Sequence, residues 1–251
     1  RTRDGVVYEV DARLRPSGRS GPLATSLAAF VEYHSTEAEL WERQALVRAR
    51  VVWSEGDLAA KVGEAIAART WSASLDAHGV AEIAQLRSRV EKELSGEDEA
   101  HRNLKTGRGG LVDIEFLVQC LQRLHGGSEP WLQHRSTLLA LARLHDKGVL
   151  KEADYGRLVG AYQFLRHLEH RLQIDEDRQT HTLPQSQEAL EEVAQRMPGG
   201  GTAQSLLQEL GAHLGYVARL YDRVVHTRAQ EVPPTPGAIP LQPDRAWRGR
   251  N

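Results

Sequence analysis

The sequence has little cysteine, few lysines and no long apolar run. Its single cysteine, Cys120, excludes an internal disulfide and favours a reducing compartment such as the cytoplasm. No apolar run approaches the roughly 20 residues that a membrane-spanning helix needs, so a membrane partner is not expected. The formal net charge of -2 provides no general positive field, and a nucleic acid held through its phosphates is therefore not expected either.

Several common catalytic signatures are also missing. The sequence contains no Gly-x-Ser-x-Gly motif, which marks many serine hydrolases. His167 and His170 lie one helical turn apart with Glu169 between them, but neither an HExxH motif nor a cysteine cluster accompanies them. Nucleophilic catalysis and a zinc site are therefore not indicated.

The chain is long enough for a sizeable core. It has 251 residues, of which 40% are hydrophobic and 26% charged, as expected for one large or two modest globular domains. It begins without methionine and enters a predicted strand almost at once, so we expect it to be a piece of a longer protein. The lack of a signal peptide therefore says little about its origin.

Residues 6–18 begin with a predicted strand whose two faces differ, because side chains alternate along a strand. The apolar face carries Val6, Tyr8, Val10, Ala12 and Leu14. The charged face carries Glu9, Asp11, Arg13 and Arg15. Two acids and two arginines in a row suit a site that binds Mg²⁺ and a phosphate together. The alternative is a solvent-facing strand with ion pairs between these acids and arginines, and a magnesium site would need further carboxylates from elsewhere.

The rest of the chain is predicted to be helical. Ser26 is a candidate cap for one helix, and Ser35 or Thr36 for a second helix that runs through Val51. Short polar connections between amphipathic helices favour an antiparallel bundle. The further helices are expected over residues 56–71, 80–95, 111–126, 135–147, 151–177, 186–197 and 202–229.

Two helical segments carry candidate phosphate-binding groups. Arg43 and Arg50 are seven residues apart on the second predicted helix, so they share a face there. Their arginine side chains suit phosphate oxygens, but a solvent-facing surface with ion pairs, such as one from Glu39 to Arg43, is the more common explanation of this spacing.

A glycine-rich segment, Lys105 to Gly110, precedes the helix predicted at 111–126. Glycines before a helix allow backbone amides to approach an anion at its positive end, which makes Lys105, Gly109 and Gly110 candidates for binding a nucleotide. The segment lacks the Gly-Lys-Ser/Thr ending of a P-loop. Asp113 and Glu115 follow, about 200° apart around the helix, so we expect them to face different partners.

Three motifs, taken in order, carry a resemblance to a known family. They are Tyr-Glu-Val-Asp-Ala-Arg-Leu-Arg-Pro-Ser-Gly-x-x-Gly-Pro-Leu at 8–23, Trp-Glu-Arg-Gln-Ala-Leu-Val-Arg-Ala-Arg at 41–50 and Lys-x-Gly-x-Gly-Gly-Leu-x-Asp-Ile-Glu-Phe-x-Val-Gln at 105–119. Together they resemble the bifunctional glutamine synthetase adenylyltransferase/adenylyl-removing enzymes over roughly residues 1 to 230. In that family one half adds AMP to a tyrosine of glutamine synthetase, and a similar half removes it by phosphorolysis.

The resemblance implies a fold and a division of the chain. Each half of the family consists of a nucleotidyltransferase domain of the DNA polymerase β type and a helical domain. We therefore expect a mainly α structure with the C-terminal portion of a nucleotidyltransferase domain, containing one or few strands, at 1–97. A helical bundle of the PII-uridylyltransferase/adenylyltransferase type would follow at 98–230, and a disordered proline-rich tail at 231–251.

The resemblance also implies roles for residues. Asp11 would be the third catalytic carboxylate and a ligand of Mg²⁺. From the strand alternation and the motif positions, Glu9 is a further catalytic candidate, and Arg13, Arg15 or Lys105 would balance the charge of the ATP phosphates. The first two carboxylates belong to a Gly-Ser...Asp-x-Asp motif that this sequence does not contain. We therefore expect the chain alone to be inactive.

Different motifs of the chain resemble different halves of the family. The segments at 10–18, 44–50 and 113–116 resemble the adenylyl-adding half, whereas those at 126–133 and 177–184 resemble the removing half; we favour the adding half. The expected partners are glutamine synthetase and the signalling protein PII. The alternatives are the removing half, a PII uridylyltransferase, or a non-catalytic helical module that binds PII or glutamine synthetase.

Overall fold

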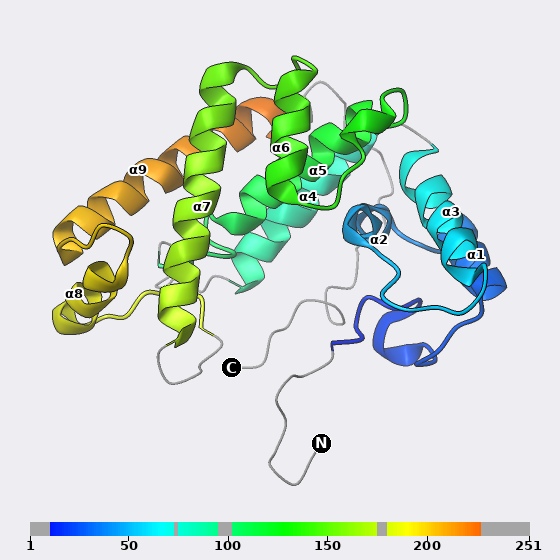
Figure 1. The fold of residues 1–251 in the computed structure, drawn as a ribbon, viewed down its shortest axis with the longest axis horizontal. Helices are drawn as coiled ribbons and strands as arrows, with labels where there is room; N and C mark the ends of the chain where they lie inside the picture. The colour runs from blue at the N-terminus through cyan, green and yellow to red at the C-terminus, as the bar shows by residue number, and fades with distance from the viewer. Residues whose placement is uncertain (1–10, 73–74, 95–101, 175–179, 227–251) are drawn as a thin grey trace, which may run out of the picture. The chain divides into compact units, whose positions relative to one another are not determined.

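A computed structural model of the chain describes residues 11–72, 75–94, 102–174 and 180–226 (Figure 1). The chain divides into two compact units, one running to Thr70 and the other beginning at Trp71. The boundary predicted between residues 97 and 98, and the tail predicted at 231–251, lie outside the described residues and stay predictions.

The first unit contains short helices joined by loops. After the 3₁₀ turn η1 (Gly18–Ser20), the elements are α1 (Leu27–Thr36), α2 (Leu40–Ala45), the 3₁₀ turn η2 (Leu46–Arg48) and α3 (Leu58–Trp71). Ser26 caps α1 as predicted, because its hydroxyl accepts a hydrogen bond of 3.2 Å from the Ala29 amide.

The strand predicted at the start of the chain is wrong for its described part. Residues 11–15 form a turn in which the Arg15 amide donates to the Ala12 carbonyl over 3.4 Å. A strand requires a neighbouring strand for its backbone groups, and no other strand is present in the ranges described above. The preceding residues 6–10 lie outside the described residues.

The helix predicted to run through Val51 is also wrong beyond Arg48. Glu39, rather than Ser35 or Thr36, caps α2 through a capping box with Glu42. The chain tightens to a 3₁₀ turn after Ala45 and becomes extended at Ala49, where ψ is 145°. The β-branched pair Val51-Val52 has low helix propensity, which fits this ending.

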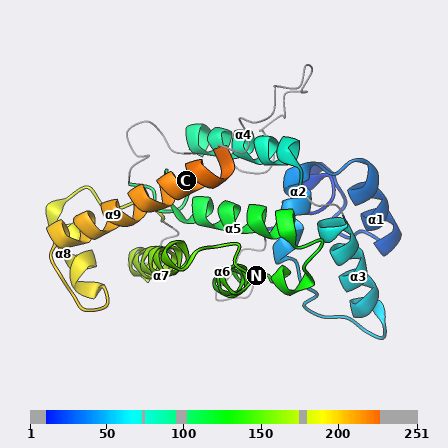
Figure 2. The same ribbon diagram turned by 90° about the horizontal axis from the view of Figure 1, so that it is seen from above.

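The second unit is built around α5 (Leu111–His125), which contacts α4 (Ala77–Leu94), α6 (Thr137–Asp146), α7 (Glu152–Ile174) and α9 (Ala203–Tyr221). Figure 2 shows α6 and α7 end-on, whereas α4, α5 and α9 run across the page, so the helices cross in layers. The remaining elements are η3 (Pro130–Leu132), α8 (Gln187–Arg196) and the π-helical turn η5 (Asp222–His226). Fully buried leucines and isoleucine fill the core: Leu104, Ile114, Leu117, Leu141, Leu144, Leu158 and Leu165.

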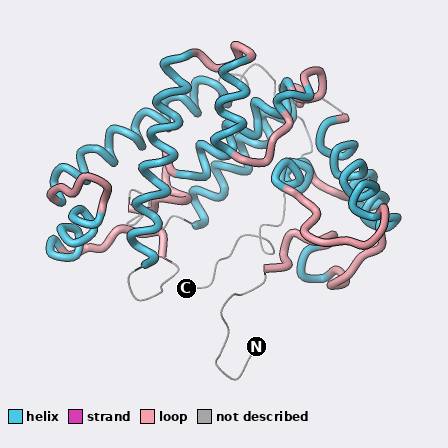
Figure 3. The backbone as a smooth tube through the Cα atoms, in the orientation of Figure 1, coloured by secondary structure: helices cyan, strands magenta, loops and turns pink. Residues whose placement is uncertain are grey.

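The prediction of a mainly α fold is confirmed, and Figure 3 shows helices joined by loops. Within the described ranges, extended pairing is limited to an isolated antiparallel bridge between Asn103 and Thr182. No helix of the described part is both long enough and apolar enough to cross a membrane.

Candidate functional site

The glycine-rich segment lies beside residues 180–183, far away in the sequence. The Leu104 amide donates to the His181 carbonyl over 2.8 Å, and the Leu183 amide donates to the Arg102 carbonyl over 3.0 Å. Asn103 shapes the following turn, because its side-chain oxygen accepts from the Lys105 amide at 3.0 Å and the Thr106 amide at 2.9 Å. The structure thus joins two motifs that sequence analysis singled out separately.

The backbone amides of this segment donate within the protein. The Gly109 amide donates to Asp113 Oδ2 over 2.5 Å, and the Gly110 amide donates to the Gly107 carbonyl over 3.0 Å. At the start of α5, the Leu111 amide donates to the Leu104 carbonyl over 2.9 Å, so this helix end is already supplied with acceptors. The binding role of Gly109 and Gly110 stays a prediction, while these contacts give both a structural role.

Close packing also requires glycine at position 109. Gly109 has a φ of +77°, and a Cβ atom there would lie 2.0 Å from the Leu214 carbonyl oxygen of α9. A Cβ on Gly110 would lie 2.6 Å from the Leu104 carbonyl oxygen. The segment is therefore pressed against α9 and against its own preceding turn.

Asp113 faces α4 from the first turn of α5. Its carboxylate forms an ion pair with Arg87, whose side chain is only 2% exposed. Arg87 Nη2 also donates to the carbonyls of Thr106 at 3.0 Å and Gly107 at 3.2 Å. Arg87 thus connects α4, the glycine-rich segment and the start of α5.

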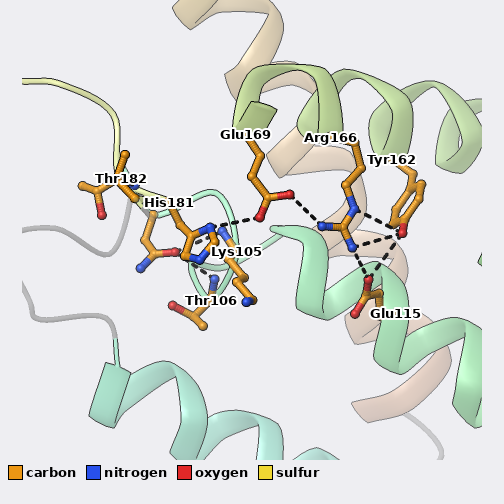
Figure 4. A network of polar contacts seen from close by, with 10 residues as sticks. Lys105, Thr106, Glu115, Tyr162, Arg166, Glu169, His181 and Thr182 are labelled. Atoms are coloured by element: carbon orange, nitrogen blue, oxygen red, sulfur yellow. Dashed lines mark hydrogen bonds and ion pairs between the residues drawn. The ribbon is translucent and has the colours of Figure 1, made fainter. Parts of the chain in front are cut away.

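Glu115 faces α7 instead and belongs to the polar network in Figure 4. Arg166 Nη2 donates to Glu115 Oε1 over 2.7 Å, and Arg166 Nη1 donates to Glu169 Oε2 over 2.6 Å. Glu169 Oε1 lies 2.9 Å from His181 Nδ1. Asp113 and Glu115 therefore face different partners, as predicted, and the network connects α5, α7 and the segment after α7.

Glu169 is held as a carboxylate within this network. Burial by itself raises the pKa of its carboxyl, but the contacts with His181 and Arg166 outweigh burial and lower that pKa to about 2. Because its side chain is only 5% exposed, these two partners replace the water that the charge has lost.

Lys105 and Arg108 of this segment have solvent-exposed side chains, and Arg108 is paired with Asp222 at 2.5 Å. Figure 4 shows Lys105 beside His181, and the Lys105 ammonium group has no hydrogen bond or ion pair to any described residue. The backbone of Lys105 is fixed while its charge is available, and an anionic substrate group is the chemistry that this arrangement suits.

In the first unit, Asp11 pairs with Arg13. Arg13 Nε lies 2.9 and 2.8 Å from the two Asp11 carboxylate oxygens, and these contacts lower the pKa of the Asp11 carboxyl below its usual value. Arg15 Nε donates to the Gly21 carbonyl over 3.2 Å and Nη1 to the Ala12 carbonyl over 2.8 Å. Glu9 lies outside the described residues.

These residues do not complete a magnesium site by themselves. Mg²⁺ is usually held by more than one carboxylate, water and substrate phosphates, and both oxygens of Asp11 contact Arg13. Within the part of the chain that the structure describes, no group of three or more histidine, cysteine, aspartate or glutamate side chains could hold a metal.

Arg43 and Arg50 do not share a helical face. Arg43 lies on α2, whereas Arg50 follows the extended residue Ala49. Arg50 is exposed, while Arg43 Nε is buried without a hydrogen-bond partner in the described structure. The shared face predicted for the pair is therefore wrong, because the helix ends between them.

Two family models match successive parts of the chain. Residues 1–65 match glutamate-ammonia ligase adenylyltransferase, and residues 80–225 match GlnD PII-uridylyltransferase. The second match covers more than half of the chain and contains the whole network of Figure 4.

Curated relatives are named bifunctional glutamine synthetase adenylyltransferase/adenylyl-removing enzyme. One from Corynebacterium efficiens is 42% identical over 76% of this chain, one from Aromatoleum aromaticum 37% over 92%, and one from Streptomyces coelicolor 35% over 98%. The chain belongs to this adenylyltransferase family, and its residues 80–225 to the GlnD PII-uridylyltransferase family.

The family relation confirms the resemblance based on three motifs. The chain spans 18%, 24% and 25% of the length of those three relatives. Asp11, Arg13 and Arg43 fall within the adenylyltransferase match, whereas Lys105 falls within the uridylyltransferase match.

Sequence reasoning missed most of the buried polar groups of this family member. Nothing in the sequence marked Arg87 as a buried residue, because it belongs to an ordinary amphipathic helix. Arg166 was likewise indistinguishable from a surface residue, and Glu169 was noted only as the residue between two histidines. His181 did lie in a recognised motif, so that motif was the one available pointer to the network.

Proposed function

We propose that this chain is part of a nucleotidyltransferase that transfers AMP from ATP to a tyrosine of glutamine synthetase. The observation that carries the proposal is the match of residues 1–65 to glutamate-ammonia ligase adenylyltransferase. The names of the curated relatives support it. ATP, Mg²⁺ and the partners glutamine synthetase and PII belong to the proposal, as does a cytoplasmic location.

The proposed reaction makes specific demands on charge. The tyrosine hydroxyl oxygen bonds to the α-phosphorus of ATP, the bond from that phosphorus to the α,β-bridging oxygen breaks, pyrophosphate leaves, and the hydroxyl proton passes to solvent water. Negative charge accumulates on the phosphate oxygens, so cations placed around them lower the barrier. Lys105 has an available ammonium group for this role. Arg13 places a guanidinium group on Asp11, and the Arg15 guanidinium donates to the Ala12 carbonyl next to it in the chain.

Asp11 has a different proposed role. A carboxylate near the tyrosine hydroxyl, ionised at neutral pH, favours the loss of the hydroxyl proton, and Arg13 keeps Asp11 ionised. Because the described residues do not complete a metal centre, we propose that the isolated chain has no transfer activity. AMP transfer by the isolated chain would contradict that statement.

A second candidate is removal of AMP from adenylylated glutamine synthetase by phosphorolysis. The motifs at 126–133 and 177–184 favour it, and in the structure the second of these contributes His181 to the network with Glu169. Both reactions require binding of phosphate groups, so the two candidates differ in the direction of transfer rather than in the cations used.

The experiment uses the full-length enzyme and both directions of transfer. Asp11→Asn is nearly isosteric, and we expect it to reduce the supported direction about 10²–10³-fold, as for loss of a group that stabilises transition-state charge. Lys105→Gln should also reduce turnover. Lys151→Gln is the matched control, because Lys151 is an exposed lysine outside both proposed roles.

The two candidates predict different losses. If adenylylation falls and phosphorolysis does not, the adding role is supported; the reverse supports the removing role. Unchanged rates in both directions for a folded Asp11→Asn enzyme would overturn the proposed function.

A further inference from the structure

Three helices of the first unit each carry a side chain with a buried nitrogen that has no hydrogen-bond partner in the described structure. His34 comes from α1, Arg43 from α2 and Arg69 from α3. His34 is 4% exposed, and both guanidinium groups influence its imidazole: after burial, Arg43 and Arg69 are the causes that lower the pKa of His34. We call these three residues the basic cluster.

The fold leaves the buried nitrogens of the basic cluster without hydrogen-bond partners among the described residues. His34 Nδ1, Arg43 Nε and Arg69 Nε are buried and have no hydrogen-bond partner within the described structure. An unsatisfied buried donor costs about 1–3 kcal/mol, and more when it belongs to a charged group. Arg43 Nε and Arg69 Nε always carry a hydrogen, so both indicate a missing acceptor near His34.

The nearest acid in the sequence is committed elsewhere. Glu42 Oε1 accepts from the Tyr33 hydroxyl over 2.7 Å, and Glu42 Oε2 accepts from the Glu39 amide over 2.9 Å. Neither Arg43 nor Arg69 forms an ion pair with a described residue. The positive charge of the cluster is therefore not neutralised by the described part of the protein.

The surroundings of His34 define the chemistry of the missing acceptor. The Phe30 ring centroid lies 4.5 Å from that of His34, and the Tyr33 ring meets it edge-on at 5.3 Å. These rings fix the imidazole between apolar neighbours. The guanidinium groups match two oxygens of a tetrahedral oxyanion, and two positive charges match a phosphate dianion.

We propose that the basic cluster of His34, Arg43 and Arg69 is a binding site for a phosphate group. This proposal rests on the proposed function only for the identity of the molecule that carries the phosphate. That molecule is a nucleotide or free inorganic phosphate. His34 and Arg69 are new assignments. Arg43 binds together with them, rather than with Arg50 as the heptad spacing had indicated.

Equilibrium binding to the 251-residue chain tests this site without requiring turnover. Inorganic phosphate, pyrophosphate, ATP and citrate are titrated calorimetrically at constant ionic strength, because exposed charges are screened by salt. We expect Arg43→Gln and Arg69→Gln each to weaken phosphate binding about tenfold or more, the equivalent of one lost charge-assisted hydrogen bond. Arg48→Gln is the matched control, since Arg48 is an exposed arginine of the neighbouring turn η2.

Thermal unfolding separates this site from a structural role. If the two arginines serve a ligand, Arg43→Gln and Arg69→Gln should unfold at or above the wild-type temperature without phosphate, because each removes an uncompensated charge. Arg69→Lys retains the charge but removes the planar fork, and it should also weaken phosphate binding.

The results decide the proposal and the source of the phosphate. Tighter binding of ATP than of inorganic phosphate would identify a nucleotide as the carrier, and the opposite order would identify free phosphate. Absence of phosphate binding by the wild-type chain, equal weakening by Arg48→Gln, or equal binding of citrate would each overturn the proposed site. Such a result would leave the proposed adenylyl transfer untouched, because that is measured by turnover of the full-length enzyme.

Discussion

Arg87 and Asp113 form a buried ion pair that connects α4 to the first turn of α5. Their side chains are 2% and 4% exposed. Removing one partner leaves the other charged and buried, which costs about 3–5 kcal/mol in such pairs. We therefore expect Asp113→Ala and Arg87→Ala each to lower the free energy of unfolding by about this amount, as measured by urea denaturation.

A surface pair of the same unit provides the control. Arg196 and Glu192 are 37% and 63% exposed, so Glu192→Ala should change the free energy of unfolding by less than about 1 kcal/mol. A double variant, Arg87→Met with Asp113→Leu, should recover part of the loss because neither charge remains buried. Equal effects of Glu192→Ala and Asp113→Ala would contradict the central role of the buried pair.

Glu169 predicts a specific pH dependence of stability. Its pKa is about 2 in the folded chain, against an ordinary value of 4.5. A lowered pKa stabilises the fold above the unfolded value, and that contribution is lost as the pH falls from about 4.5 to about 2. The free energy of unfolding, measured by urea denaturation at several pH values in this range, should therefore fall more steeply with decreasing pH for wild type than for Glu169→Gln. The same slope for both proteins would show that Glu169 is not held as described.

Arg166 separates two acids that would otherwise face each other across α5 and α7. It donates to both Glu115 and Glu169. We expect Arg166→Met to lower the free energy of unfolding by about 2 kcal/mol or more, because Glu169 would lose a charged partner while remaining buried. The loss should diminish at low pH, where protonation of the acids removes their repulsion, and a pH-independent loss would point to packing instead.

Three glycines should respond differently to alanine. Gly156 lies in the exposed part of α7 with open space around it, so Gly156→Ala should stabilise by up to about 1 kcal/mol. Gly148 has open space but a φ of +70°, which makes alanine unfavourable by about 1–2 kcal/mol. Gly109→Ala combines a positive φ with a collision at Leu214 and should cost more than about 3 kcal/mol. Thermal unfolding should reproduce this order.

The helices that sequence analysis predicted best are those whose apolar spacing is sustained or whose first residue follows a serine cap. Ser26 and α1 illustrate this, as do α5 and α8, which begin and end within one residue of the predicted bounds. The helix through Val51 failed because Val47 and Val51 have the spacing of a helix, although the backbone had already become extended at Ala49. The spacing of apolar residues does not show at which residue the backbone stops being helical.

The candidate site was less accessible to prediction, because its partners are far apart in sequence. Asp113 and Glu115 were recognised as facing different directions, but their partners Arg87 and Arg166 lie 26 and 51 residues away. Likewise, His34 of α1 lies near Arg43 of α2 and Arg69 of α3, which are distant in sequence. A single sequence contains the residue types of such clusters and not their distances.

The contact of Gly109 with Leu214 bears on the anion-binding role proposed for Lys105. A glycine-rich loop is commonly regarded as a flap that must become ordered around its ligand, with loss of backbone entropy. Here the backbone around Lys105 is already ordered by Asn103, His181 and α9. In that proposed role, capture of an anion would restrict only one flexible side chain, at a cost of about 2 kcal/mol, and would require rotation about side-chain bonds rather than loop closure.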